Sequence, residues 1–403
     1  MKYNACLISE LIEEIAMGPF GSNIKVDCFV DEGIPVLNGS NLDGFELSEK
    51  SFRYVTKEKA NSLNKANAHK GDVVITHRGT LGQIVYIPQT AKHERYIISQ
   101  SQFRVRCNDK VLPEYLVYYF HTPVGQHKLL SNASQVGVPA LARPSSTFQQ
   151  IEIEIPDIDT QKRVTNIIDV IQRRIKANSE INDNLYAQAR AITNQWIVEN
   201  EDDYDLLPLE EIAAINPDTY SPKDEWEYVN YLDTSSIIDG CISDIQHIIP
   251  ASEKLPSRAR RIVAPNDVVF STVRPNQRHF GIISMPLPNM LASTGFAVIR
   301  SINPLVCNEL IYLCLTENAF IEKMQQLAEQ STSTFPSIKP SDLGVCEIPC
   351  PKDRSSSKLT ETLRNMFALV AANQCENASL AELRDSLLPK LMSGEIDVSD
   401  IQL

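Results

Sequence analysis

Two long stretches of this chain place apolar residues at alternating steps of four and three positions, the heptad spacing of a coiled-coil helix. They run from Val164 to Trp196 and from Leu359 to Leu391, so the second repeats the first about 195 residues later. At 1.5 Å per residue, a helix of about 36 residues is roughly 54 Å long. The seam positions are Val164, Ile168, Ile171, Ile175, Asn178, Asn182, Leu185, Ala189, Ile192 and Trp196 in the first helix, and Leu359, Leu363, Met366, Val370, Asn373, Asn377, Leu380, Arg384, Leu387 and Leu391 in the second.

The seam asparagines predict how the two helices pair. An Asn in an apolar seam lowers stability but fixes register, because its amide needs a polar partner. In an antiparallel pair, Asn178 faces the neighbourhood of Asn377 and Asn182 faces that of Asn373. A parallel pair also matches Asn with Asn, but the antiparallel pair gives a pseudo-two-fold molecule with a domain at each end, and we favour it. The alternative is that each helix packs only on its own domain.

The repeat extends outside the helices. Residues 13–16 (EEIA) recur as 210–213, and residues 71–75 (GDVVI) recur as 266–270 (NDVVF). The order of such segments is kept while the residues between them diverge. This pattern predicts a duplicated fold with two differently tuned surfaces.

Each half contains strand-like and helix-like segments. Residues 84–87, 103–106 and 151–155 alternate β-branched or aromatic residues with polar ones, which predicts strands. Residues 114–130 and 309–329 carry apolar residues at helical spacing, which predicts one helix in each half. The fold class is therefore α+β.

The domain boundaries follow from the repeat. We expect two duplicated α/β domains, each followed by one of two long helices that form an antiparallel coiled coil. The predicted segments are 1–156 for the first domain, 157–200 for the central helix, 201–351 for the second domain, and 352–403 for the C-terminal helix and tail.

Composition places the chain among ordinary globular proteins. Of its 403 residues, 43% are hydrophobic and 22% charged, which excludes a disordered or low-complexity chain. No apolar run reaches the roughly 18 residues of a membrane-spanning helix, and the N-terminus has no signal-peptide core. The nine cysteines are scattered and form no CxxC pair, as expected of free thiols. We therefore expect a cytoplasmic protein.

The net charge of −13 argues against nucleic-acid binding until it is divided along the chain. Residues 201–350 carry 21 acidic and 10 basic side chains, whereas residues 1–155 carry 16 of each. Within the acidic region, residues 254–278 hold six basic side chains and one acidic side chain. Overall charge governs solubility and does not exclude a basic face.

No motif supports catalysis. The sequence has neither a GxxxxGK[ST] phosphate loop nor a GxGxxG turn, and its seven histidines form no HxxxH pair. The carboxylates after Pro156 are typical of a helix start, with Asp157 or Asp159 as the N-cap. We therefore assign no catalytic residue, metal ligand or cofactor to the chain.

Two groups of loop residues occur at matching positions in the two halves and could contact DNA. Arg pairs with guanine, Asn and Gln pair with adenine, and hydroxyl groups reach phosphates. Taken singly, each residue is better explained as a solvated loop residue; as matched groups, they favour a ligand surface. The candidates in the first half are His77, Arg78, Thr80, Asn132, Ser134, Gln135 and Arg143. Those in the second half are Arg258, Arg260, Arg261, Arg274, Asn276, Gln277, Arg278, Ser331, Thr332, Ser333 and Lys339.

Three short strings resemble a known family. Residues 387–396 (LLPKLMSGEI) are similar to the C-terminal signature of type I restriction–modification specificity subunits. Residues 18–23 (GPFGSN) and 71–75 (GDVVI) resemble that family's N-terminal motif and central strand. The second half shows NPD at 216–218 where a second GPFG string would stand, so its loop there differs. The repeated domain and helix also resemble the family's architecture over the whole chain.

The resemblance implies a non-catalytic subunit that binds double-stranded DNA. Each globular block would be a target recognition domain for one half of a split, asymmetric sequence. Two modification (methyltransferase) subunits, which bind S-adenosylmethionine, would dock on the chain, with motor-endonuclease restriction subunits as optional further partners. The rival hypotheses are a stand-alone DNA nuclease or methyltransferase, and a scaffold that binds only proteins.

Overall fold

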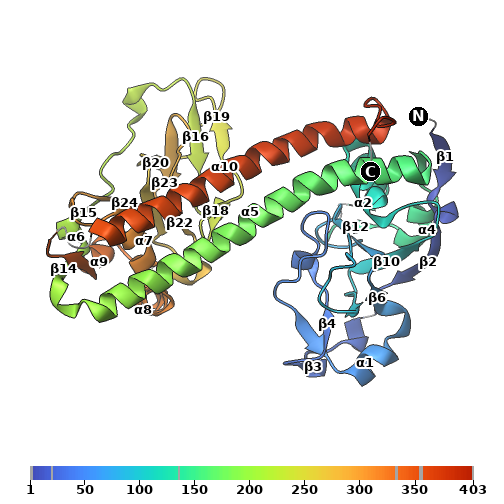
Figure 1. Cartoon of the computed structure of the whole chain (residues 1–403), viewed down its shortest axis with the longest axis horizontal. Coiled ribbons are helices and arrows are strands. Elements are labelled where there is room, and N and C mark those ends of the chain that lie inside the picture. Colours follow the sequence, from blue (N-terminus) through green and yellow to red (C-terminus); the bar gives the residue numbers. More distant parts are fainter. Residues whose placement is uncertain (1–2, 20, 135–136, 332–334, 354–356, 402–403) are drawn as a thin grey trace. The chain divides into compact units, whose positions relative to one another are not determined.

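The computed structural model describes residues 3–19, 21–134, 137–331, 335–353 and 357–401. The chain forms two compact units. Unit 1 comprises Met1–Ile175 and Ala378–Leu403, and unit 2 comprises Lys176–Asn377. Each unit therefore combines a globular part with portions of two long helices, α5 (Ile158–Glu199) and α10 (Ser357–Ser393) (Figure 1). Among the described helices, none combines the length and apolar character needed to cross a membrane.

Unit 1 is built on two sheets. The first has strand order β2-β10-β7-β8 with antiparallel pairs, and the second has order β3-β5-β4-β9-β6, in which β4 and β9 are parallel. Two further pairs join β1 to β13 and β11 to β12. The bounds are β1 Asn4–Leu7, β2 Ile12–Met17, β3 Phe29–Val30, β4 Ile34–Val36, β5 Arg53–Val55, β6 Asn67–His69, β7 Asp72–Thr76, β8 Ile84–Tyr86, β9 Arg95–Ile97, β10 Gln102–Cys107, β11 Ala133–Ser134, β12 Ala140–Leu141, β13 Glu152–Ile155, α1 Lys57–Ser62, α2 Pro113–His121, α3 Pro123–Leu130 and α4 Pro144–Gln149.

Unit 2 repeats this topology. Its sheets have orders β15-β24-β21-β22 and β19-β16-β23-β20, the latter with a parallel β16–β23 pair, and β14 pairs with β25. The predicted duplication is confirmed. The bounds are β14 Tyr204–Pro208, β15 Ala213–Ile215, β16 Val229–Leu232, β17 Ile237–Ile238, β18 Cys241–Ile242, β19 Gln246–Ile248, β20 Ala259–Ile262, β21 Asp267–Ser271, β22 Phe280–Ile283, β23 Met290–Ser293, β24 Phe296–Ser301, β25 Glu347–Pro351, α6 Leu209–Ile212, α7 Asn308–Leu315, α8 Asn318–Glu329 and α9 Pro340–Gly344.

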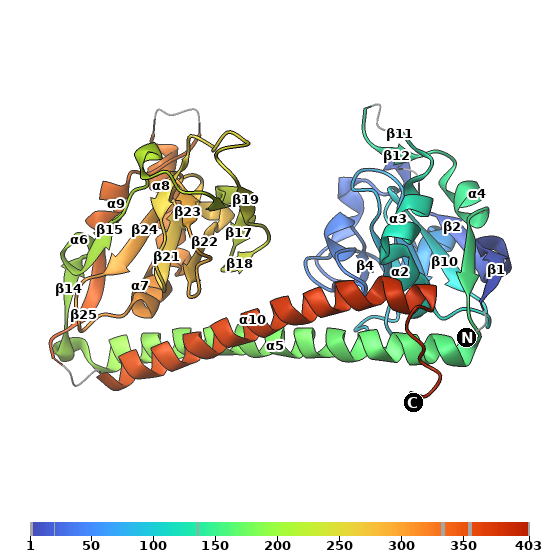
Figure 2. The same cartoon turned by 90° about the horizontal axis from the view of Figure 1, so that it is seen from above.

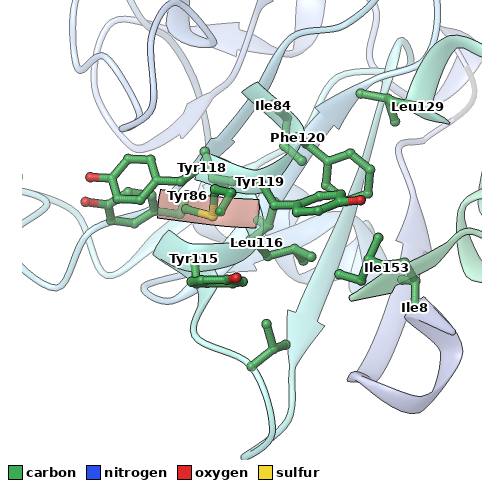
Figure 3. Close-up of a cluster of buried hydrophobic side chains, with 14 of the residues drawn as sticks. Ile8, Ile84, Tyr86, Tyr115, Leu116, Tyr118, Tyr119, Phe120, Leu129 and Ile153 are labelled. Carbon is green, nitrogen blue, oxygen red and sulfur yellow. The ribbon is translucent and has the colours of Figure 1, made fainter. Parts of the chain in front are cut away.

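The helix predicted in each half is interrupted, so the prediction of one continuous helix is wrong. In unit 1, α2 ends before Thr122, and α3 begins at Pro123, which has no N–H to donate. The Thr122 hydroxyl accepts the Gly125 N–H and caps α3. In unit 2, α7 ends at Leu315 and α8 begins at Asn318, with neither a proline nor a side-chain cap at the start of α8. The aromatic side chains of α2 fill the core of unit 1, where Figure 3 shows Phe120 beside Ile84 and Tyr118 beside Tyr86.

A buried carboxylate at the start of the central strand recurs in both units. Asp72 opens β7 and accepts a bidentate pair from Arg106, whose Nε lies 2.9 Å from Oδ1. Asp267 opens β21 and accepts the same pair from Arg300, with Nε at 2.8 Å. Asp72 also lies 3.4 Å from the buried Arg104. The repeated GDVV and NDVV strings therefore mark a structural ion pair that fixes the strand preceding each candidate loop.

The two long helices pack antiparallel within unit 2. The Asn178 Nδ2 donates to Asn377 Oδ1 at 2.9 Å, and the Asn373 Nδ2 donates to Asn182 Oδ1 at 2.8 Å. These are the predicted partners, and they confirm the antiparallel choice. All twenty predicted seam positions are buried or half-buried. The role of the asparagines in fixing register stays a prediction.

Arg384, the charged residue in the second seam, has a defined place in unit 1. Its Nη1 donates to Gln172 Oε1 at 3.1 Å, and its guanidinium lies 5.1 Å from the centre of the Phe45 ring. Further along α10, Leu388 and Leu391 belong to the unit 1 core. The alternative in which each helix packs only on its own domain is therefore wrong.

Candidate nucleic-acid interface

The two candidate groups of unit 1 lie together. The loop after β7 runs beside the β11–β12 hairpin: Leu141 N–H donates to His77 C=O, and Gly79 N–H donates to Pro139 C=O, both at 2.9 Å. Arg78 forms a bridge with Ala140 between these two hydrogen bonds. Figure 2 shows this hairpin at the side of unit 1 away from α5. Residues that are about 60 positions apart in sequence thus form one surface.

Unit 2 repeats this pairing. Ile338 N–H donates to Thr272 C=O at 2.9 Å, and Arg274 N–H donates to Pro336 C=O at 3.0 Å. Val273 forms the bridge with Ser337. We call these two paired-loop surfaces the reading loops: 77–80 with 133–134 and 137–143 in unit 1, and 272–278 with 335–339 in unit 2. The matching positions inferred from the sequence are therefore matched in structure as well.

Sequence reasoning missed the residues that hold the reading loops together. The prolines at 139 and 336 supply the accepting carbonyl in each unit, and Thr272 adds a side-chain hydrogen bond to Gly295 C=O at 2.9 Å. A sequence signal for this pairing exists, because each proline stands two residues before the apolar residue, Leu141 or Ile338, whose N–H donates to the opposite loop. The pattern was missed because the loop sequences around the two prolines differ between the two halves of the chain.

Arginines in the left-handed backbone region lie in or beside the reading loops. Arg143, Arg274 and Arg278 have φ values of 47°, 48° and 59°. A residue with a Cβ at positive φ is disfavoured by roughly 1–2 kcal/mol, and Asn and Asp tolerate it better than Arg. The other non-glycine residues with positive φ are mostly Asn and Asp. Strained arginines at these positions favour a functional role.

Arg274 and Arg278 differ in their partners. The Arg274 guanidinium lies 4.8 Å from the Phe335 ring centre, and among the described residues no carboxylate pairs with it. The Arg278 Nε instead contacts Asp239 Oδ1 at 2.6 Å, and its Nη1 donates to Asn318 Oδ1 at 3.1 Å. Arg274 is therefore free to meet a ligand, while Arg278 ties its loop to a neighbouring turn.

In unit 1, Arg78 and Arg143 are exposed. Within the described part of the chain, neither guanidinium has an acceptor side chain. His77 is half-buried with its Nε2 3.1 Å from Gln100 C=O, and burial lowers its pKa. A neutral His77 therefore joins the loop to Gln100, and Arg78 and Arg143 supply the positive charge at the surface.

The remaining candidates are placed as follows. Lys339 is the N-cap residue that precedes α9, and its N–H donates to Asp342 Oδ2 at 2.7 Å. Ser331 is half-buried, while Gln135, Thr332 and Ser333 lie outside the described residues. Exposed side chains are those of Thr80, Asn132, Ser134, Asn276, Gln277 and Lys339.

Arg258, Arg260 and Arg261 lie on or just before β20, outside the reading loops. Arg258 is adjacent to them: a Cβ built on Gly295 would lie 2.6 Å from its Nη2, and Gly295 binds Thr272. Arg260 and Arg261 are half-buried in the strand itself. No cluster of three His, Cys, Asp or Glu side chains in the described ranges could hold a metal ion.

Residues 24–187 match the family model for the type I restriction modification DNA specificity domain. The chain is 22% identical over 413 residues to the HindI specificity subunit of a type I restriction enzyme from Haemophilus influenzae, covering 81% of this chain and 87% of that protein. It is also 22% identical over 416 residues to the MjaIX specificity subunit of Methanocaldococcus jannaschii, covering 97% of this chain and 93% of that protein.

The fold is similar to that of a solved structure. A type I restriction–modification S subunit from M. genitalium superposes with a TM-score of 0.55 at 15% identity, over 97% of this chain and 96% of that one. At this identity the likeness concerns the fold alone.

Proposed function

This chain belongs to the family of type I restriction–modification specificity subunits, and on that premise we propose that it reads the two halves of a split, asymmetric DNA sequence, one with each globular part. The observation that carries the proposal is the repeated pairing of the reading loops. The same three backbone contacts recur in both units, around different exposed side chains. A shared frame with variable side chains is what reading two unrelated half-sites requires.

The proposal assigns the chemistry to partner subunits. Methylating an adenine requires a pocket that receives the extruded base, and we assign no such pocket to this chain. Two modification subunits that bind S-adenosylmethionine would supply it, and motor-endonuclease restriction subunits would join them in a restriction complex. The site of action would be the cytoplasm.

An assay of the purified chain separates this proposal from the enzyme hypothesis. The full chain is incubated with DNA, Mg²⁺ and labelled S-adenosylmethionine, with and without the modification subunit. We expect methyl transfer only when that subunit is present. Methylation or cleavage by the chain alone would support a stand-alone enzyme.

Sequencing of methylated adenines tests the reading function. In cells with the chain, methylated adenines should lie within one split sequence, and they should disappear when the chain is deleted. If they persist, the chain does not select the target, and a scaffold that binds only proteins becomes the better account.

A further inference from the structure

Two adjacent arginines of unit 2 have enclosed nitrogens without a hydrogen-bond acceptor. They are Arg260 Nη1 and Arg261 Nε, both on strand β20. Neither nitrogen reaches solvent, and neither has a partner among the described residues. Both side chains are only half-buried, so part of each guanidinium still faces the surface. An enclosed donor without an acceptor lowers stability, which calls for an explanation.

Neither arginine is compensated by a carboxylate in the described part of the chain. Burial alone lowers the pKa of Arg261. Arg300 shows the opposite case in the same unit, because Asp267 and Asp218 both bind its guanidinium and raise its pKa. Residues 201–350 carry 21 acidic side chains, so carboxylates are abundant there. Asp218 lies on the segment that pairs with β20, but its carboxylate binds Arg300 and no described carboxylate forms an ion pair with Arg260 or Arg261. Two positive charges therefore remain for an external anion.

The position of β20 relates this charge to the reading loops. β20 is the last strand of the sheet β19-β16-β23-β20, and its outer side pairs with residues 218–220, where Tyr220 N–H donates to Arg260 C=O at 2.7 Å and Thr219 forms a bridge with Arg261. The register of β20 against β23 shifts between Ala259 and Arg261. Such bulges redirect side chains at sheet edges. The strand starts just after Arg258, which lies against Gly295 beside the reading loop of unit 2. The corresponding terminal strand of the sheet in unit 1, β6, contains no arginine.

We propose that Arg260 and Arg261 bind a phosphate group of the DNA backbone beside the half-site read by unit 2. This inference rests on the proposed function and adds a contact that carries no sequence information. A guanidinium suits phosphate because it presents several N–H donors to the oxygens. A phosphate at the half-exposed guanidinium groups would supply the missing negative charge and draw the enclosed N–H groups outward. It would let an otherwise acidic unit hold DNA.

Replacing each arginine by Met tests this while keeping the apolar part of the side chain in place. The full chain is titrated with several unrelated duplexes between 50 and 300 mM salt. Each phosphate contact contributes about 0.9 to the slope of log affinity against log salt. We expect Arg261→Met and Arg260→Met each to reduce that slope by up to about one and to weaken every duplex several-fold alike.

Arg364→Met is the matched control, because Arg364 is an exposed arginine of unit 2 on α10. It should leave both slope and affinity unchanged. Unchanged slopes in both β20 variants would overturn the inference. Arg274→Ala in the same assay separates the two levels: if it alters sequence preference while the β20 variants have no effect, only the phosphate contact is wrong. If no variant weakens binding and every duplex binds equally, the proposed function fails.

Thermal unfolding with inorganic phosphate identifies the source of the anion. DNA should protect the wild-type chain more than both Met variants, whereas inorganic phosphate at equal ionic strength should give little difference. If inorganic phosphate alone protects the wild type as strongly as DNA does, the site binds free phosphate and the DNA assignment is overturned. A Met variant that unfolds above the wild type and binds DNA normally would also contradict it.

Discussion

The two units share a backbone plan but attach it to the long helices differently. In unit 1 the turn at Gly44 leads to Phe45, which lies against Arg384 of α10. In unit 2 the seam position equivalent to Arg384 is the fully buried Ala189 of α5. There the matching turn packs on aromatic residues, since a Cβ on Gly240 would lie 3.4 Å from the Tyr312 hydroxyl. The two units thus share their strand order, while different side chains anchor each unit to the long helices.

The reading loops likewise share a backbone arrangement but differ in their side chains. Both units keep the paired loops, but Arg78 and Arg143 present charge in unit 1, whereas Arg274 does so in the more acidic unit 2. Backbone hydrogen bonds do not depend on side-chain identity, so the loops can diverge without losing their pairing. Under the proposed function, the repeat keeps the position of the DNA contact in each unit and changes the side chains that would make it.

The largest expected difference between the units concerns their buried carboxylates. Asp72→Ala leaves the buried Arg104 with the half-exposed Glu14 as its remaining carboxylate among the described residues, and should lower the free energy of unfolding by about 3–5 kcal/mol. Asp267→Ala leaves Arg300, which is 29% exposed and retains Asp218, so the loss should be about 1–3 kcal/mol. Amide hydrogen exchange in β7 and β21 measures both. Equal losses would show that the two ion pairs are equivalent.

Arg274 and Arg278 were both predicted from the sequence to contact DNA, and the structure distinguishes them. Arg274→Ala should weaken the half-site read by unit 2 by about 1–3 kcal/mol for the preferred base and leave the other half-site intact. Arg278→Ala should mainly loosen the Asp239 turn, with a loss of about 1 kcal/mol or less in stability. Binding to a panel of single-base variants checks this. Equal losses on every sequence would make Arg274 a phosphate contact.

The seam asparagines test the helix pairing of unit 2. Asn182→Leu alone should destabilise that unit by about 1–2 kcal/mol, because the Asn373 amide loses its acceptor. Replacing Asn182 and Asn373 together by Leu should restore or raise the melting temperature but loosen the register. Disulfide trapping between cysteines placed across the two helices reports register. A less stable double variant with a single register would contradict this role.

The smallest effect concerns the start of α5 in unit 1. Asp157 accepts the Thr160 N–H at 3.0 Å, and this bond lowers its pKa. The sequence left Asp157 and Asp159 open as the N-cap, and the structure selects Asp157. Asp157→Ala should cost about 1 kcal/mol at pH 7.

The pH dependence of that effect follows from the lowered pKa. The stabilisation is complete above the ordinary Asp pKa of about 4 and is lost as pH falls through the lower folded value. Unfolding curves of Asp157→Ala and wild type should therefore converge in acid. Asp159→Ala is the control, since Asp159 makes only an exposed pair with Lys162. A larger loss for Asp159→Ala would reverse the assignment.

The features that the sequence predicted are local or repeated, whereas those that it missed join segments far apart in the sequence. The seam and its asparagine partners were predictable because heptad spacing is local and the repeat supplies the partner. Three contacts could not be predicted: the ion pair of Asp72 with Arg106, the ion pair of Arg278 with Asp239, and the packing of Arg384 on Phe45. Each joins segments distant in sequence, and no local pattern records which arginine meets which carboxylate. For the same reason, Arg278 looked as available as Arg274.

Selection of DNA from a random-sequence pool, with the modification subunit present, tests the central claim most directly. The wild-type chain should enrich one split sequence with two defined halves. Arg78→Ala should relax one half only, and Arg274→Ala the other half only. Failure to enrich any split sequence, or relaxation of both halves by either substitution, would contradict the assignment of one half-site to each unit.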